Sequence, residues 1–447
     1  MFKKVLVANR SAVAARVLRT LDKMGVASIA VYSEADAGAP YLARAGEAHC
    51  IGPGPARESY LDGKKIVELA HKLGADAIHP GYGFLSENAA FARQVHEAGI
   101  AFIGPNARLI DAMGHKTRAR ELMMGHGMPM NAGSGVLPAD EAAVAAAAER
   151  IGYPVLVKPA AGGGGIGMIA ARDAKQLAAA VTQAQSMAMR GFGNGEVYLE
   201  RLIERPRHIE IQVLGDRHGR VRHIFERDCS VQRRHQKVIE EATAPGVPRE
   251  KVTALCERVA EMMAAIGYDN IGTIEMLMGD DGSFSFLEMN TRLQVEHGVT
   301  EEVTGIDLVE AQIRSAAGEA LDTFLPAAIE PSGHAIQARV YAEDPVRFFP
   351  SPGPLKTFRP PRGEGIRVET GYAEGGTVTP NYDPLLAKVI ARGATRNEAV
   401  ARLEAALEAF TIEGLKSNIP ALLRILRHEP FRAGAVHTGL LAEAQAT

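Results

Sequence analysis

Apolar and polar side chains alternate with a period of two residues in the segment 272–289. Residues 272–278 and 283–289 each alternate as β-strands do, and the GDDG sequence between them is a strong turn signal. The pattern therefore predicts a hairpin. Continued alternation puts the even-numbered residues of the second strand and of its extension on one face, which begins apolar and becomes polar: Phe284, Phe286, Glu288, Asn290, Arg292, Gln294 and Glu296.

Two carboxylates of this hairpin are expected to share that face. A turn centred at 279–282 sets Glu275 opposite Phe286, with Glu288 as its diagonal neighbour, about 7–8 Å away at the backbone. Together with Asn290, these oxygen donors suit Mg²⁺ held between the protein and nucleotide phosphates. A solvated acidic hairpin is the alternative, and the polar residues that continue to Glu296 favour the site.

Strand and helix patterns alternate through the N-terminal quarter of the chain. Strands are expected at residues 4–8, 27–32, 75–79 and 100–103, with helices between them. This alternation predicts a doubly wound parallel sheet of the α/β class. The first strand is not followed by a G-x-G-x-x-G sequence, so dinucleotide binding is not supported.

The loop HPGYGFLSEN at 79–88 follows the third of these strands. Open α/β sheets bind ligands in loops at the carboxyl ends of their strands. A purely structural loop, ending in Asn88 as the N-cap of a helix to residue 98, is an equally good interpretation.

A strand at 153–158 ends in Lys158 and leads into a glycine-rich run at 159–168. Glycines let backbone N–H groups approach phosphate oxygens, and a lysine adds a point charge, so the segment predicts a phosphate clamp. A second strand at 168–171 favours a lid hairpin over a flexible linker. The preceding residues 117–150 are helical with a break at 127–135, and Lys116 alone would more often be a surface lysine.

The rest of the chain is expected to mix strands and helices. Residues 227–237 form a basic loop, for which anion binding and a solvated face are both open interpretations. Other elements are expected as strands at 196–203, 208–214 and 334–341, and as helices at 249–266, at 302–318 and from 389 to the end.

Composition narrows the classes of function. A chain of 447 residues suggests about three domains. The net charge of −3 gives no basic field for nucleic acid, and no apolar run is long enough for a signal peptide or a membrane span. Cys50, Cys229 and Cys256 show neither metal spacing nor a disulfide framework, so a reduced, cytoplasmic setting is expected.

Motifs along nearly the whole chain resemble the biotin carboxylases, a branch of the ATP-grasp superfamily. The motifs are ANR at 8–10, HPGYGFLSEN at 79–88, GGGG at 162–165, ERDCSVQRRHQKVIEE at 226–241, EMNTRLQVEH at 288–297 and ARVYAEDP at 338–345. Their shared order makes the resemblance specific. It implies an α/β (α+β) fold with a doubly wound N-terminal domain at 1–114, an ATP-grasp domain at 115–330 whose mobile glycine-rich lid covers about 131–203, and a β-rich C-terminal domain at 331–447.

The resemblance also implies where nucleotide binds. ATP would lie between the lid and the central sheet, with Lys116 and Lys158 on the phosphates and Gly164 and Gly165 closing over them. Adenine would be bound by residues 200–203, mainly through backbone groups. The remaining ATP contacts implied are Glu200, Arg201, Leu202, Ile203, His208, His235, Glu275 and Glu288.

Metal, bicarbonate and biotin positions follow from the same resemblance. Glu275, Glu288 and Asn290 match the Mg²⁺ ligands, for which Mn²⁺ can substitute. Tyr82 would lie close to biotin. The bicarbonate and catalytic positions implied are Lys237, Arg292, Gln294, Val295, Glu296 as the base, and Arg339 as the residue that stabilises the biotin enolate.

The implied chemistry begins with attack of bicarbonate on the γ-phosphate, giving carboxyphosphate and ADP. Carboxyphosphate then releases CO₂ and phosphate, and phosphate takes the proton from the biotin ureido nitrogen. The chain has no A-M-K-M biotinylation sequence. We therefore expect biotin on a separate biotin carboxyl carrier protein, with separate carboxyltransferase subunits, in an acyl-CoA carboxylase such as the acetyl-CoA carboxylase of fatty acid biosynthesis. A homodimer that contacts neither nucleic acid nor membrane is expected.

Departures from the family pattern occur at a few positions. Ser11 and Ala12 stand where Gly-Glu is usual, and Ile166 stands where the glycine-rich loop usually has a basic residue. His115, Thr243 and Gly298 are further departures, and none of them is assigned to metal, base or bicarbonate.

Two other functions stay open beside this one. One is another ATP-grasp ligase that uses an acyl phosphate, against which the RLQVEH sequence at 292–297 and Arg339 argue. The other is a non-catalytic, nucleotide-binding assembly or regulatory paralogue, which Ser11, Ala12 and Ile166 keep open.

Overall fold

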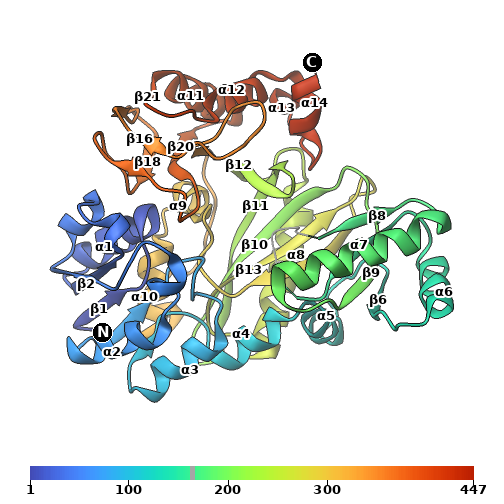
Figure 1. Cartoon of the computed structure of the whole chain (residues 1–447), viewed down its shortest axis with the longest axis horizontal. Coiled ribbons are helices and arrows are strands. Elements are labelled where there is room, and N and C mark those ends of the chain that lie inside the picture. The colour runs from blue at the N-terminus through green and yellow to red at the C-terminus, as the bar shows by residue number, and fades with distance from the viewer. Residues whose placement is uncertain (162–166, 447) are drawn as a thin grey trace.

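The computed structural model describes residues 1–161 and 167–446, and residues 162–166 and 447 lie outside the described part. Figure 1 shows an N-terminal unit in blue, long central strands in green and yellow, a green unit with helices α6 and α7 to one side, and a C-terminal unit in red above. No described helix is long and apolar enough to cross a membrane.

The N-terminal unit contains a five-stranded parallel sheet, in the order β3-β2-β1-β4-β5. The parallel sheet predicted from the sequence is therefore confirmed. The third strand was not anticipated, because its EAHC sequence is short and polar. The strands are β1 (Lys4–Val7), β2 (Ala27–Tyr32), β3 (Glu47–Cys50), β4 (Ala77–His79) and β5 (Ala101–Phe102).

Helices cover both faces of this sheet. Helix α1 packs on one face together with α10, which arrives from much later in the chain, and α2 and α3 pack on the other face. Asn88 caps α3, because its side chain accepts a hydrogen bond from the N–H of Phe91. The helices of this region are α1 (Ser11–Lys23), α2 (Gly63–Lys72), α3 (Ala89–Glu97) and α4 (Ala107–Gly114), with 3₁₀ turns η1 (Glu34–Asp36), η2 (Pro40–Arg44) and η3 (Ala56–Glu58).

A four-stranded antiparallel sheet forms the side unit, in the order β6-β9-β7-β8. Strands β7 and β8 pair as the expected hairpin around the glycine-rich run. Strand β6 lies in the segment that we expected only to interrupt the helices, because its GSGV sequence has no strand pattern. The elements are α5 (Lys116–Gly125), β6 (Gly133–Val136), α6 (Glu141–Ile151), β7 (Val155–Pro159), β8 (Ile169–Ala171), α7 (Ala174–Phe192) and β9 (Val197–Arg201).

An eight-stranded antiparallel sheet runs from the centre of the molecule into the C-terminal unit, in the order β14-β13-β10-β11-β12-β15-β20-β18. The expected boundary at residue 330 lies in the connection between strands that belong to this one sheet. The strands are β10 (Arg207–Gly215), β11 (Val221–Arg233), β12 (Gln236–Ala242), β13 (Asn270–Met278), β14 (Phe284–Asn290), β15 (His334–Tyr341), β18 (Ile366–Thr370) and β20 (Leu385–Gly393).

The basic segment at 227–237 is not a loop, and that prediction was wrong. It forms the second half of β11, the turn at Arg234 and His235, and the first two residues of β12. The side chain of Arg227 is fully buried, where Glu210, Gln212 and Thr300 accept its hydrogen bonds. A charge run can lie inside a sheet when each charge meets a partner, and this pairing depends on residues distant in the chain.

Helix predictions failed at two other places. Residues 302–318 are not one helix, because α9 (His297–Thr304) ends at Gly305, whose φ of 73° is left-handed, and Asp307 caps α10 (Leu308–Ala316). The helices expected from residue 389 begin only after β20. The remaining elements are α8 (Arg249–Ile266), η4 (Leu321–Thr323), β16 (Gly353–Pro354), β17 (Thr357–Arg359), β19 (Thr377–Val378), α11 (Arg396–Ala409), β21 (Thr411–Glu413), α12 (Ile419–Arg427), α13 (Glu429–Arg432) and α14 (Leu440–Ala446).

Candidate active site

The β13–β14 hairpin has a different register from the one predicted. Met276 pairs with Phe286, and Glu275 pairs directly with Glu288, so Leu287 is the extra residue of a β-bulge. The expectation that Glu275 faces Phe286 with Glu288 as its diagonal neighbour was wrong. The sequence carries no signal for this bulge, since the alternation on either side of it is regular.

The bulge also separates the two halves of the face that we predicted to be continuous. Phe286 packs into the apolar core with Met276 and Met289, whereas Glu275 and Glu288 line a cavity. A one-residue slip sends side chains to opposite faces of a sheet. The two carboxylates are therefore directly opposite each other on the cavity side.

This cavity has a volume of about 780 Å³ and lies between the side unit, the central sheet and the C-terminal unit. It collects seventeen of the twenty residues that the sequence implicated. These are Lys116, Lys158, Glu200, Arg201, Leu202, Ile203, His208, His235, Lys237, Glu275, Glu288, Asn290, Arg292, Gln294, Val295, Glu296 and Arg339. Tyr82 lines a neighbouring cavity, and Gly164 and Gly165 lie outside the described residues, as does Ile166.

Lys237 is a cation that lines the cavity and is shared by three carboxylates. Its Nζ lies 2.5 Å from a carboxylate oxygen of Glu210, 2.6 Å from Glu275 and 2.7 Å from Glu296. Burial disfavours the charged amine, but the three carboxylates together raise the pKa of Lys237 well above its ordinary value. The side chain is therefore a fixed positive charge that an incoming anion can reach.

Glu296 is fully buried between two cations. Lys237 donates to one carboxylate oxygen and Arg339 to the other, at 2.7 and 2.8 Å. Burial would raise the pKa of Glu296, but Lys237, Arg339 and Arg227 outweigh it and lower that pKa below the ordinary value. The carboxylate is thus ionised and able to accept a proton.

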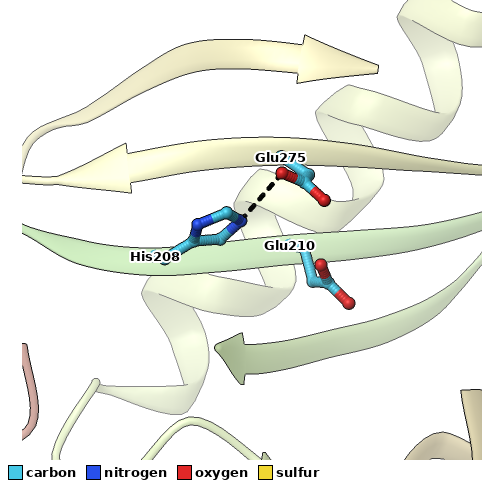
Figure 2. A group of neighbouring side chains, drawn as sticks. All are labelled: His208, Glu210 and Glu275. Carbon is cyan, nitrogen blue, oxygen red and sulfur yellow. Dashed lines mark ion pairs between the residues drawn. The ribbon is translucent and has the colours of Figure 1, made fainter. Parts of the chain in front are cut away.

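Glu210 completes this group, and the sequence analysis missed it. Figure 2 shows Glu210 beside His208 on β10, with His208 pointing across to Glu275 on β13. The distance from His208 Nε2 to Glu275 is 3.0 Å, and Glu210 is fully buried between Lys237 and Arg227. The signal was present in the alternation of residues 208–214, where His208, Glu210 and Gln212 are the polar positions of a buried strand.

Arg292 links the hairpin to the loop after β4. Its guanidinium donates to Glu87 at 2.8 Å, to Asn290 at 2.8 Å and to Gln294 at 2.8 Å. Because Glu87 belongs to the HPGYGFLSEN sequence, the N-terminal unit helps to orient this arginine. The functional interpretation of that loop gains support, since the loop also carries Tyr82.

The donor set of the hairpin fits Mg²⁺. Glu275 and Glu288 present carboxylate oxygens from paired positions, and Asn290 contributes an amide whose Nδ2 lies 2.8 Å from Glu275. Mg²⁺ prefers hard oxygen ligands and is usually held by one or two carboxylates plus phosphate oxygens. In the structure Lys116 lies 3.2 Å from Glu288, so the same oxygens are already balanced by positive charge.

The opposite wall of the cavity comes from the side unit. Lys158, on β7, is buried with its Nζ 2.5 Å from Glu200, on β9, and Arg120 also pairs with Glu200. The N–H groups of Arg201 and Leu202 donate to the carbonyls of residues 132 and 154. These bonds hold the strand end that the resemblance associates with adenine.

A second cavity of about 380 Å³ adjoins the first. It is lined by Tyr82 and shares Glu87, Arg292, Val295 and Arg339 with the larger cavity. Ser11 also lines it and has a φ of 54°, in the left-handed region that favours glycine. Its buried hydroxyl has no hydrogen-bond partner among the described residues, which gives a structural reason for the glycine usual in the family.

Three family models together match most of the chain. Residues 1–110 match the biotin carboxylase N-terminal domain, residues 115–324 the ATP-binding domain of the carbamoyl-phosphate synthase L chain, and residues 337–443 the biotin carboxylase C-terminal domain. The two flanking domains distinguish this chain from other ATP-grasp ligases, which was one of the alternatives left open.

Individual relatives and structures agree with the models. The biotin carboxylase of Halalkalibacterium halodurans is 51% identical over 99% of this chain and 97% of its own length. A Campylobacter jejuni biotin carboxylase in complex with β-γ-ATP has a TM-score of 0.96 at 43% identity, and covers 99% of both chains. The biotin carboxylase domain dimer of Hydrogenobacter thermophilus 2-oxoglutarate carboxylase, in complex with MgADP, ADP and bicarbonate, has a TM-score of 0.95 at 44% identity, and covers 99% of this chain and 98% of its own.

Proposed function

Because the chain belongs to the biotin carboxylase family and carboxylates biotin with ATP and bicarbonate, we propose how its own residues divide that reaction. The proposed domains are residues 1–114, the ATP-grasp domain at 115–330 with its lid at about 131–203, and residues 331–447. The observation that carries the proposal is the buried Glu296 carboxylate between Lys237 and Arg339 in the large cavity.

ATP occupies the part of the cavity between the side unit and the central sheet. Lys116 and Lys158 bind the phosphates, with Gly164 and Gly165 over them. Residues 200–203 bind adenine, and His208 and His235 contact the nucleotide. Mg²⁺, or Mn²⁺ in its place, would be held by Glu275, Glu288 and Asn290, and when bound it neutralises charge on the phosphate oxygens.

Bicarbonate binds beside Glu296. Lys237 and Arg292 supply positive charge for the anion, and Gln294 and the backbone of Val295 orient it. Glu296 accepts the proton of bicarbonate, and the bicarbonate oxygen attacks the γ-phosphorus of ATP. The new O–P bond forms while the bond between the γ-phosphorus and the ADP oxygen breaks. The protein contributes mainly by positioning bicarbonate next to the γ-phosphate, because phosphoryl transfer requires little covalent catalysis.

Biotin enters from the second cavity. Carboxyphosphate breaks into CO₂ and phosphate, the phosphate takes the ureido proton of biotin, and the nitrogen attacks CO₂. Arg339 donates to the ureido oxygen as negative charge develops there, and Tyr82 packs against the ring. Arg339 lines both cavities, which supports this role at their junction.

The partners are proposed from the family. We propose that a biotin carboxyl carrier protein delivers biotin, that carboxyltransferase subunits of an acyl-CoA carboxylase use the product in the cytoplasm, and that the chain forms a homodimer. A dimer is what the Hydrogenobacter thermophilus domain forms.

The test is ATP hydrolysis by the purified chain with Mg²⁺ and bicarbonate, measured with and without free biotin. We expect biotin to stimulate ADP release, and Glu296→Ala to reduce the stimulated rate by about 10²–10⁴-fold, as for loss of a general base. The matched control is Glu226→Ala, since Glu226 is equally buried and paired with Arg249 but does not line the cavity. Biotin stimulation that survives in Glu296→Ala would contradict the assignment of the base.

A further inference from the structure

The segment from Gln294 to His297 carries the proposed bicarbonate residues, yet it belongs to no strand, and α9 begins only at its last residue. The carbonyls of Gln294 and Glu296 accept the backbone N–H groups of His297 and Val299, at 3.3 and 3.2 Å. No backbone N–H of the described residues donates to the carbonyl of Val295, and buried carbonyls need partners. A side chain therefore has to satisfy this carbonyl.

Two buried side chains bind the carbonyls of this segment. Lys388 Nζ donates to the carbonyl of Val295 at 2.8 Å, and His297 Nδ1 lies 2.7 Å from the carbonyl of Gln294. Burial, reinforced by nearby Lys388, lowers the pKa of His297 well below its ordinary value, so the ring is neutral and its Nδ1 carries the donated proton. Lys388 and His297 are both fully buried.

Lys388 also touches the other walls of the site. On β20 it pairs in register with Arg339 on one neighbouring strand and with Glu369 on the other. Its Nζ lies 6.0 Å from the centre of the Tyr82 ring. One lysine thus adjoins Val295, Arg339 and Tyr82, and all three of these residues line the smaller cavity.

Glu369 holds the lysine in this position. The distance from Lys388 Nζ to Glu369 is 2.6 Å, and Glu369 is itself surrounded by Arg16, Arg19 and Arg367. None of these side chains lines either cavity. An outer partner of this kind controls the geometry of the groups that bind the substrate.

We propose that Lys388, oriented by Glu369, is a positioning residue that fixes the 294–297 segment for bicarbonate binding. The inference rests on the proposed function, because it concerns the segment to which bicarbonate binding is assigned. Lys388 does not touch substrate. It binds the carbonyl of the peptide that joins Val295 to Glu296. This contact fixes the position of the backbone proposed to bind bicarbonate and the position from which the Glu296 side chain extends.

The experiment measures the KM for bicarbonate, the KM for ATP and the kcat of biotin-dependent ATP hydrolysis in Lys388→Met. Methionine keeps the volume and loses the donor, and Glu369 keeps its three arginines, so no buried carboxylate is left alone. We expect the KM for bicarbonate to rise about 10- to 100-fold, as for loss of an outer partner or a displacement near 1 Å. The KM for ATP should stay at the wild-type value.

Glu369→Gln and the double variant complete the test. We expect Glu369→Gln to raise the KM for bicarbonate less than Lys388→Met does, because the lysine can still donate. The double variant should match Lys388→Met, since Glu369 then has no lysine to orient. If Lys388→Met does not fold, Glu369→Gln alone decides, and a wild-type KM for bicarbonate in it overturns the proposal.

The matched control is Arg249→Met, which removes the cation from buried Glu226 away from both cavities. It should lower thermal stability and leave the KM for bicarbonate unchanged. A Lys388→Met enzyme with a normal KM for bicarbonate, or with equal rises for bicarbonate and ATP, overturns the proposal. Wild-type protein without biotin-dependent hydrolysis would instead contradict the proposed function.

Discussion

Two clusters of buried charge lie close together in this molecule and have opposite designs. The open cluster is Lys237 with Glu210, Glu275, Glu296 and Arg339, and four of these five side chains line the large cavity. The closed cluster has no member among the lining residues of the cavities described above, and consists of Arg16, Glu301, Asp307, Arg367, Glu369 and Lys388.

The two clusters differ in what their charges can still do. In the open cluster one lysine is shared by three carboxylates, and an anion or a metal can enter and change the partners. In the closed cluster, residues of the N-terminal unit, of α9 and α10, and of the C-terminal strands are paired with one another. Buried charge that faces a cavity serves chemistry, and buried charge that faces only protein fixes the arrangement of the parts.

The largest expected effect comes from removing the central cation of each cluster. Lys237→Met should lower biotin-dependent turnover by about 10²–10³-fold, because the site loses its charge for bicarbonate. Arg16→Met should instead lower the free energy of unfolding by about 3–5 kcal/mol, since it leaves buried carboxylates short of a partner. Turnover of the folded Arg16→Met protein should remain close to wild type.

Chemical denaturation measures the stability of both variants, and steady-state kinetics measure their turnover. The comparison fails if folded Arg16→Met, measured at saturating bicarbonate, loses turnover as severely as Lys237→Met, because Arg16 would then act in catalysis and not only in the fold.

A smaller effect is expected from acid. Burial lowers the folded-state pKa of His297 well below 6.5, and the unfolded chain therefore binds a proton as pH falls below 6.5 while the folded chain does not. Stability is unaffected by this group above pH 6.5 and falls below it, until the pH reaches the folded-state pKa. The slope approaches about 1.4 kcal/mol per pH unit.

Urea denaturation between pH 7.5 and pH 5 measures this slope. His297→Asn keeps a polar donor and removes the titration, so its stability should depend less on pH over that range. An unchanged slope in His297→Asn would mean that the acid sensitivity lies in other groups. Glu369 also makes the protein less stable in acid, but only below about pH 4.5. The reason is that Lys388 and the arginines outweigh burial and lower the pKa of Glu369 in the folded chain.

The smallest effect concerns Ser11, which lies on the helix that carries Arg16 but lines the cavity of Tyr82. Ser11→Gly should raise the free energy of unfolding by about 1 kcal/mol, because only glycine adopts a φ of 54° without strain. Thermal unfolding checks the gain, and Ser134→Gly, at an exposed strand with no left-handed backbone, is the control that should not gain. No stabilisation by Ser11→Gly would show that the surrounding contacts have removed the strain.

Local patterns in the sequence were enough for much of the fold. The period of apolar residues predicted the parallel sheet, the β7–β8 hairpin, and helix α8 over its observed bounds. The split between α9 and α10 was also readable, because Gly305 and Asp307 are ordinary stop and start signals. Its omission was an error of interpretation.

Motif recognition placed the site residues, and seventeen of them line one cavity. Motifs name residues but not their partners. Three ion pairs of the site join strands and loops that are far apart in the chain. They are Lys237 with Glu210, Lys158 with Glu200, and Arg292 with Glu87.

The sequence by itself determined the parallel character of the N-terminal sheet, the polar character of the hairpin end and the family, because these depend on local periodicity and on residue identity. Only the tertiary structure decided the bulge that sets Glu275 opposite Glu288, the burial of Arg227, Asp228 and Arg233, and the contact of Lys388 with Val295. Each of these depends on long-range pairing between strands, whose register and partners are selected by packing over the whole sheet and not by neighbours in the chain.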